Sequence, residues 1–392
     1  MKKNEFATFV AYLAMFGVAI LVGLVWLRPV ISEVGSTLGI HYILLVILSL
    51  LSGVIINSLL IELGHLLGAK TGKYEVRAWT VLFFGFQKKN GKKKWGFHQF
   101  DGLSGETKLK PMDVEKSSLS GYIAFPLLFL LAEVVACAFM IAISVRLRAS
   151  SDESVAGIGW MHIFALVLLG TAAMLYIYDF FPAHLETNND GYLAIVLSKP
   201  INKVAYNNML LADAIAEEGG TAPQVPIYET VTDFTFRLNL VSAYQAIQKG
   251  DSRKAIQILD MAINTDKGLS SGNKMEASAL KLSILLREGR SEGKTMFEEM
   301  SDEQKKYISS VASMPALRCY LLISGLIEDA ENEANFALGK VEKAIKDCEK
   351  SWIAIEKALI AADIQAVMKK HPTWQLEPLP WAEKETKEEP KE

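Results

Sequence analysis

The sequence predicts a mainly α-helical membrane protein: a polytopic bundle of four transmembrane helices with a small β-hairpin insertion, followed by a soluble α-helical domain. A hydrophobic content of 51% and a mean hydropathy of +0.21 are too high for an ordinary soluble protein, yet 22% of the residues are charged. Four segments are long enough to cross a bilayer core of about 30 Å, which takes roughly 20 apolar residues. The predicted spans are 6–27, 34–61, 119–145 and 155–178.

The charge content of these segments favours spans over buried soluble helices. Three of the four contain no Asp, Glu, Lys or Arg, and the third contains only Glu133. The first segment follows Lys2 and Lys3, as a signal peptide would, but its apolar run is too long for a signal core and has no small-residue cleavage site. We therefore expect it to be retained as a transmembrane helix.

The distribution of basic residues predicts the orientation in the cell membrane. Lys and Arg near the ends of spans stay preferentially in the cytoplasm. The loop 70–117 contains eleven of them, whereas the other two loops between spans are poor in them. We therefore expect a multi-pass protein with this loop and both termini in the cytoplasm, and with lysines that meet anionic lipid headgroups of the bilayer.

The character of the sequence changes after residue 200. Residues 1–200 are assigned to the transmembrane domain, and 201–234 to a juxtamembrane helix and a linker that contains Gly219, Gly220, Pro223 and Pro226. Residues 235–372 show apolar positions at helical spacing among charges, with no run long enough to span a membrane. They predict a cytoplasmic helical domain.

Three helix pairs can be drawn in this cytoplasmic domain. The first is 240–263, with a turn at Gly250-Asp251 and small residues available for close packing, and it resembles a tetratricopeptide hairpin. The second joins 274–287 to 301–312, and the third joins 317–329 to 334–362. We interpret the domain as repeat-like and expect it to bind a protein partner.

The remaining composition narrows the functional classes. Residues 373–392 end in a run of Lys and Glu and are predicted to be a disordered charged tail. A net charge of −3 gives no reason to expect a nucleic-acid partner. The three cysteines fall in a span and in the cytoplasmic part, as expected of unpaired thiols in a reducing compartment.

A candidate chemical motif stands at the end of the second span. In zinc proteases the helical pattern His-Glu-x-x-His places two histidine ligands on one face, with the Glu as general base for a zinc-bound water. Here Glu62 and His65 stand in the second and last positions, but the first is Ile61. Ionisable residues within a span mark functional sites. The alternative is a membrane-boundary helix whose Glu62 and His65 face the cytoplasmic interface.

A second motif follows the fourth span. Asn188-Asn189-Asp190-Gly191 comes shortly after Pro182. Considered alone, it fits equally a polar turn that leaves a membrane helix.

Taken together, these motifs resemble the site-2 protease family of intramembrane zinc metalloproteases. The resemblance covers roughly 57–197 and includes the Gly68–Tyr74 continuation, an aromatic segment at 79–86 where the family has a membrane-associated β-hairpin, and Gly121 at the start of the third span. The Asn-Asp-Gly form is similar to small bacterial members. The resemblance implies that His65 and Asp190 are zinc ligands and that Glu62 is the general base.

The departure at Ile61 puts the chemistry in doubt. Isoleucine offers no lone pair, and catalytic zinc normally has three protein ligands and a water. Zinc is therefore expected to be weak or absent. His184, between Pro182 and Asp190, is a possible substitute ligand, and His98 in the basic loop is another.

Two main hypotheses follow. In the first, the chain is a non-catalytic protein of this type, which holds a membrane-protein or peptide partner in its transmembrane groove and a protein partner on its helical domain. In the second, it is an active intramembrane metalloprotease with a rearranged ligand set. A third and weaker interpretation is a membrane-tethered repeat scaffold in which the motif is accidental.

Overall fold

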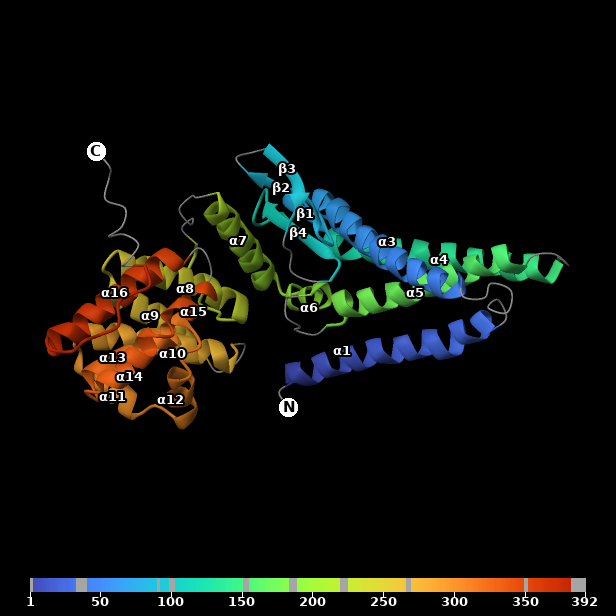
Figure 1. Ribbon diagram of the computed structural model, residues 1–392. Coiled ribbons are helices and arrows are strands. Elements are labelled where there is room, and N and C mark those ends of the chain that lie inside the picture. Colours follow the sequence, from blue (N-terminus) through green and yellow to red (C-terminus); the bar gives the residue numbers. More distant parts are fainter. Residues whose placement is uncertain are drawn as a thin grey trace, which may run out of the picture. The chain divides into compact units, whose positions relative to one another are not determined.

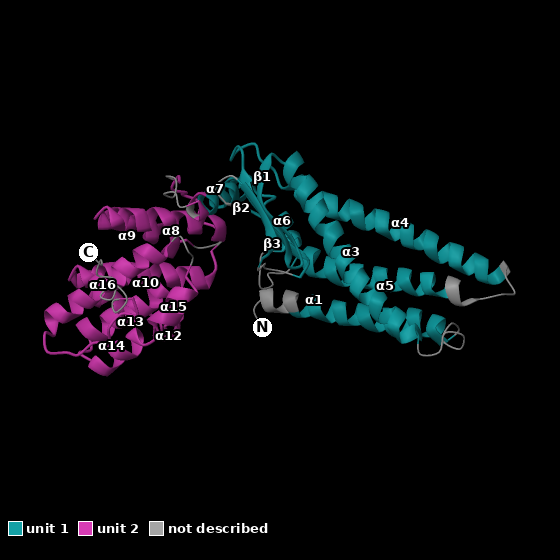
Figure 2. Cartoon of the chain, turned by 45° about the horizontal axis from the view of Figure 1, so that its top comes forward, with its two compact units in different colours: residues 1–214 teal, residues 215–392 magenta. Residues whose placement is uncertain are grey.

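A computed structural model describes residues 3–32, 41–89, 92–98, 103–150, 155–182, 189–218, 225–265, 269–348 and 352–381. They belong to two compact units, Met1–Ala214 and Ile215–Glu392, shown in different colours in Figure 2. The chain is mainly helical, with one small antiparallel sheet, as predicted.

The first unit contains four helices that are long and apolar enough to cross a membrane: Phe9–Ser32, His41–Thr71, Ser120–Ala149 and Gly159–Phe180. The first of these comprises α1 (Lys3–Ile20) and the π-helical turn η1 (Leu21–Leu27); the others belong to α3 (His41–Thr71), α4 (Ser120–Ser150) and α5 (Val155–Phe180). Helices α3, α4 and α5 pack against one another, and α1 packs against α5 (Figure 1).

Helix α3 extends ten residues beyond the end predicted for the second span. The prediction placed this span at 34–61, because the apolar run stops at Glu62, whereas the helix continues to Thr71. Residues 34–40 lie outside the described part of the chain. Glu62 and His65 are both buried, so the helix carries these two ionisable side chains into the bundle and does not end before them.

A row of glycines lets α3 approach the start of α4. Gly64, Gly68 and Gly72 recur every four residues and therefore share one face of the helix. A Cβ atom at Gly68 would overlap the Gly121 carbonyl and the Tyr122 Cα, and a Cβ at Gly64 would lie 2.6 Å from the Pro126 nitrogen. Small residues at such spacing allow apolar helices to pack backbone to backbone.

Asn57 ties α3 to α5 in the apolar part of the bundle. Its amide Nδ2 donates to the Leu168 carbonyl at 3.2 Å and to the Thr171 Oγ1 at 3.1 Å, and also to the Gly53 carbonyl of its own helix. Asn57 is fully buried. The pairing offsets the cost of placing a polar amide among apolar side chains.

The basic loop folds into a four-stranded antiparallel sheet, larger than the hairpin predicted. Its strands are β1 (Tyr74–Val81), β2 (Phe84–Lys89), β3 (Lys92–Phe97) and β4 (Gly105–Pro111), in the order β3-β2-β1-β4. The expected aromatic hairpin is present as β1 and β2, with Trp79 opposite Phe86. The register of β1 on β4 shifts between Val76 and Ala78.

Helix α7 (Pro200–Glu217) fastens this sheet to the bundle. It follows α6 (Asp190–Val196), and Asn207 on it accepts a hydrogen bond from the Tyr74 hydroxyl at 2.6 Å. Arg77 of β1 donates to the Ala214 carbonyl at 2.7 Å. Because of these contacts, the predicted juxtamembrane helix packs within the first unit, whose boundary is Ala214 and not residue 200.

The second unit is built of short antiparallel helix pairs. Its nine described helices are α8 (Asp233–Gln248), α9 (Ser252–Ile263), α10 (Ser271–Arg287), α11 (Ser291–Glu298), α12 (Asp302–Ser309), α13 (Met314–Leu326), α14 (Glu331–Leu338), α15 (Val341–Lys346) and α16 (Ile353–Lys370). The pair α8–α9, with its turn at Gly250, is where the sequence predicts it. Together α12 and α13 are also apolar enough to span, but they are bent by 100° and α13 lies in the core of this unit.

Two details of this unit differ from the prediction. The segment 334–362 is not one helix: α14 and α15 end before residue 347, and α16 begins at Ile353. The predicted disordered tail begins too early, because Trp374, Leu376, Leu379 and Trp381 pack against the core of the unit. The sequence from residue 382 onward lies outside the described residues.

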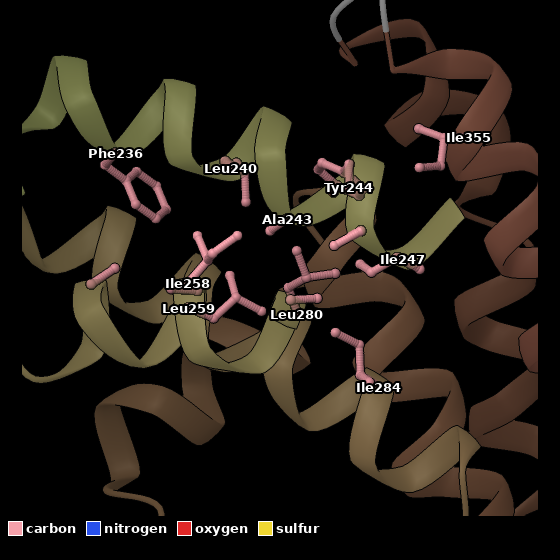
Figure 3. Close-up of a cluster of buried hydrophobic side chains, with 14 of the residues drawn as sticks. Phe236, Leu240, Ala243, Tyr244, Ile247, Ile258, Leu259, Leu280, Ile284 and Ile355 are labelled. Carbon is pink, nitrogen blue, oxygen red and sulfur yellow. The ribbon is translucent and has the colours of Figure 1, made fainter. Parts of the chain in front are cut away.

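Three apolar clusters form the core of this unit. In the one shown in Figure 3, α8 contributes Leu240 and Tyr244, α9 contributes Leu259, and α10 contributes Leu280. Ile355 of α16 completes the cluster from the other side. The core therefore joins the first two helix pairs to the last helix.

An ion-pair network lies at the centre of the same unit. Arg318 is fully buried, and its guanidinium donates to the Asp363 carboxylate at 2.7 Å and to the Glu356 carboxylate at 3.1 Å. Tyr244 donates its hydroxyl to Glu356, and Arg287 lies 3.4 Å from Asp363. Burial alone would lower the pKa of Arg318, but the two carboxylates outweigh burial and raise it, so Arg318 stays charged.

We predict that Gly68→Ala destabilises the first unit by about 1–3 kcal/mol, because the added Cβ has to push α4 away from α3. Gly17→Ala is the matched control, since nothing lies within 4 Å of the Cβ position at Gly17 on α1. The measurement is the thermal unfolding midpoint of the detergent-purified protein. Equal midpoints for the two variants would contradict the close α3–α4 packing.

We predict that Arg318→Met destabilises the second unit by about 3–5 kcal/mol, because it leaves two buried carboxylates without their cation. Adding Glu356→Gln and Asp363→Asn to the same chain should recover most of the loss. The measurement is the rate of thiol labelling of the fully buried Cys319, located by mass spectrometry. If Cys319 in the Arg318→Met variant is labelled as slowly as in the parent chain, the assigned role of this network is refuted.

Candidate functional site

His65 is at the centre of a buried polar site in the first unit. Its Nε2 lies 2.7 Å from the Asp190 Oδ2, and its Nδ1 lies 3.5 Å from the Glu62 Oε2. The imidazole stacks on the ring of Tyr122, with centroids 4.1 Å apart and planes 5° from parallel. The structure therefore brings together the three residues that the resemblance singled out, from elements 125 residues apart in the sequence.

Glu62 is held by the sheet. The Ser104 hydroxyl donates to its Oε1 at 3.1 Å, and the Thr107 hydroxyl donates to its Oε2 at 2.7 Å. The Trp79 indole donates to its backbone carbonyl at 2.9 Å. Strands β1 and β4 are thus part of the site, because they orient a carboxylate that belongs to α3.

Gly105 lets β4 come this close to α3. Its φ of +156° is rare for a residue with a side chain, and a Cβ there would overlap the Thr80 carbonyl and lie 3.0 Å from the Glu62 Cγ. The strand that carries Thr107 could not reach Glu62 with a larger residue at this position.

Each residue of Asn189-Asp190-Gly191 has its own role in positioning the carboxylate. The Asn189 amide donates to the carbonyls of Tyr178 at 2.9 Å and Phe181 at 2.6 Å, and its oxygen caps the start of α6. A Cβ at Gly191 would overlap the Phe180 carbonyl. The motif therefore latches α6 onto the end of α5, which directs Asp190 at His65.

Asp179, at the end of α5, also belongs to the site. Its Oδ2 lies 3.4 Å from the Ser104 hydroxyl, which also serves Glu62. Among the described residues, the carboxylates of Glu62, Asp179 and Asp190 therefore share a buried region with the imidazole of His65. Such a surplus of negative groups at low dielectric favours the binding of protons or of a cation.

Ile61 closes the site on the side where the family has its first histidine. It is 0% exposed and packs against Ala172, Leu175 and Tyr176 of α5. Tyr176 in turn donates its hydroxyl to the Pro126 carbonyl at 2.8 Å. Ile61 itself offers no atom that can bind a metal, and the hydroxyl of its described neighbour Tyr176 is engaged by the Pro126 carbonyl.

The described residues supply two of the three ligands that a catalytic zinc requires. Two ligands at zinc–ligand distances of about 2.0–2.1 Å in a tetrahedron lie about 3.3 Å apart, whereas the His65 Nε2 and the Asp190 Oδ2 are 2.7 Å apart, which is a hydrogen-bond distance. Among the described residues, no group of three His, Cys, Asp or Glu side chains is arranged to hold a metal. The described residues therefore do not fit a three-ligand zinc.

The two candidate substitute ligands have different outcomes. His184 lies outside the described residues. His98 follows β3, where its backbone N–H donates to the Phe83 carbonyl at 2.9 Å. None of the described contacts of His98 involves Glu62, His65 or Asp190.

Sequence reasoning missed four residues of the site: Tyr122, Ser104, Thr107 and Asp179. Of these four, only Thr107 had a signal in the sequence: it stands two residues before Leu109, so both side chains lie on the same face of a strand.

No protein-family model, curated protein or solved structure matches this chain.

We predict that Thr107→Val destabilises the first unit by about 1–3 kcal/mol, since valine has a similar shape but leaves the buried Glu62 Oε2 without its closest donor. Thr295→Val is the control, because that exposed hydroxyl makes only a 3.5 Å hydrogen bond to the Ser291 carbonyl. Thermal unfolding in detergent measures both. A midpoint for Thr107→Val no lower than that of the control would count against the Thr107–Glu62 hydrogen bond.

Proposed function

We propose that this chain is a non-catalytic, site-2-protease-like integral membrane protein, which binds partner proteins through its membrane part and through its cytoplasmic helical domain. The observation that carries the proposal is the environment of Ile61. At the position of the first zinc ligand, the chain has an apolar side chain that is packed against α5 and offers nothing to a metal.

The hydrogen bonding around the site supports the same proposal. Both ring nitrogens of His65 face carboxylate oxygens, and Glu62 accepts from two hydroxyl groups. A general base that activates water needs an oxygen free to accept the water's proton. Here the Glu62 carboxylate is already engaged by the Ser104 and Thr107 hydroxyl groups, as expected of a site that holds its elements together and does no chemistry.

The surface of the sheet supports contact with the lipid bilayer. Phe83, Phe84 and Phe97 are exposed at one end of the strands, with Phe97 at 77%, and Phe83 stacks on Phe97 with centroids 5.8 Å apart. Lysines 88, 89 and 92–94 lie at the opposite end of β2 and β3. An aromatic end next to hydrocarbon and a basic end at anionic headgroups suit a sheet at the membrane interface.

The helical unit supports the second binding role. Its pairs α8–α9 and α10–α11 are joined by short turns and stack through a shared core, as in a tetratricopeptide-like repeat. Such stacks expose long surfaces that suit protein partners.

An active protease with a rearranged ligand set is the second candidate. It is favoured by the placement of His65 beside Asp190, and by the nearby carboxylates of Glu62 and Asp179. In that case His184 or Asp179 would have to supply the third bond.

We predict that wild-type protein purified in detergent contains far less than one zinc per chain, and that His65→Ala and Asp190→Ala do not change its zinc content. Ile61→His places a histidine one turn before His65 on α3, which together with Asp190 of α6 completes three ligands and should bind about one zinc per chain. Elemental analysis measures the metal. Leu60→His is the matched control, because it adds a histidine at the same depth on a different face of α3.

The opposite result is equally clear. One zinc per wild-type chain, removed by either His65→Ala or Asp190→Ala, would overturn the non-catalytic assignment. His184→Ala and Asp179→Asn would then identify the third ligand.

A further inference from the structure

The C-terminal segment Trp374–Trp381 packs on the second unit. It belongs to no helix or strand, and it follows directly on the end of α16 and the turn at His371. Side chains at every second or third position face inward: Trp374, Leu376, Leu379 and Trp381 pack against the cluster around Leu317, Leu321 and Leu338. The residues between them, such as Gln375 and Glu377, are exposed.

Side chains of α14 bind the backbone of this segment. The Asn335 oxygen accepts from the Glu377 N–H at 2.8 Å, and its amide donates to the Gln375 carbonyl at 3.1 Å. Glu331, one turn earlier, accepts from the Gln375 N–H at 2.6 Å. These bonds hold the main chain of the segment whatever its side chains are, as main-chain hydrogen bonds do in other modes of peptide recognition.

Aromatic contacts secure both ends of the segment. The Trp374 ring stacks on His371, with centroids 3.9 Å apart. The Nζ of Lys357 on α16 lies 4.7 Å from the centroid of the Trp381 ring. Between them, Pro378 and Pro380 keep the chain extended, because proline fixes φ and lowers the entropy cost of binding in this form.

The four side chains that anchor the segment are less buried than core residues. All four are only partly buried, whereas Leu317 and Leu321 beneath them are fully buried. The fit therefore resembles that of a ligand on a preformed surface more than that of an interior element.

We propose that the surface formed by α13, α14 and α16 is a peptide-binding groove, and that this chain's own C-terminal segment is its resident occupant. The partner is an extended, proline-containing peptide with aromatic or leucine side chains at the spacing of Trp374, Leu376, Leu379 and Trp381. The inference rests on the proposed binding role of the helical unit, and it is independent of the His65 site.

A tethered occupant competes with any partner. A short connection gives the segment an effective concentration of about millimolar. A partner peptide therefore has to bind more tightly than the segment, or meet a chain whose segment has already been displaced. The segment thus makes binding conditional.

The test uses a fluorescein-labelled peptide of residues 372–382 and its anisotropy with the detergent-purified protein. We expect saturable binding to a chain that ends at Thr373, and at least about tenfold weaker binding to the full chain. Asn335→Ala in the truncated chain removes two backbone hydrogen bonds and should weaken binding about tenfold. A peptide with Asp in place of both leucines is the control ligand and should not bind.

Two further measurements separate the possible outcomes. The double substitution Leu376→Asp and Leu379→Asp in the full chain releases the segment without deleting it. It should increase binding of the wild-type peptide. Protection of Cys319 from thiol labelling reports that the core of the unit is intact. No binding to either variant while Cys319 stays protected would overturn the proposal, and so would exchange of the segment only between two copies of the chain. His65→Ala should leave peptide binding unchanged, so failure of the zinc result and failure of this one are distinguishable.

Discussion

The hydrogen bond between His65 and Asp190 imposes the main constraint on the first unit of this protein. An imidazole and a carboxylate within an apolar bundle are costly unless they satisfy each other. Meeting that requirement demands that α3 continue past Ile61 and that α6 start beside the end of α5, at the level of His65. The rest of the first unit can be understood as the means by which these elements are brought together.

Glycine makes the approach possible at three of the places where elements of the first unit meet closely. Gly68 admits α4 to α3, Gly105 admits β4 to Glu62, and Gly191 admits α6 to the end of α5. Asn189 then holds α6 on α5 through two carbonyl groups. The Ser104 and Thr107 hydroxyl groups fix the Glu62 carboxylate in the same way.

The parts of the fold that were predictable from the sequence are those with a strong local signal. The four long apolar runs and the Gly250 turn are of this kind. The hairpin at 79–86 was expected from the resemblance alone, and the pairing of Trp79 with Phe86 is known only from the structure. The end of α3 was misplaced because hydropathy stops at Glu62, whereas the pairing of Glu62 and His65 with distant residues keeps the helix intact. Strand β3 was not predicted, because the three lysines 92–94 hide the alternation of apolar and polar residues that is typical of a strand. Asp179 could be assigned to the site only from the structure, in which Ser104 lies beside it.

The same reasoning gives meaning to isoleucine at position 61. A histidine there would bring a polar ring against Leu175 and Tyr176, and without a metal it would need a partner that the described neighbours of Ile61 do not offer. Isoleucine removes that requirement, while Glu62, His65 and Asp190 retain one another as partners. Because Glu62, His65 and Asp190 can stabilise the bundle without a metal, their presence alone is not evidence for catalysis.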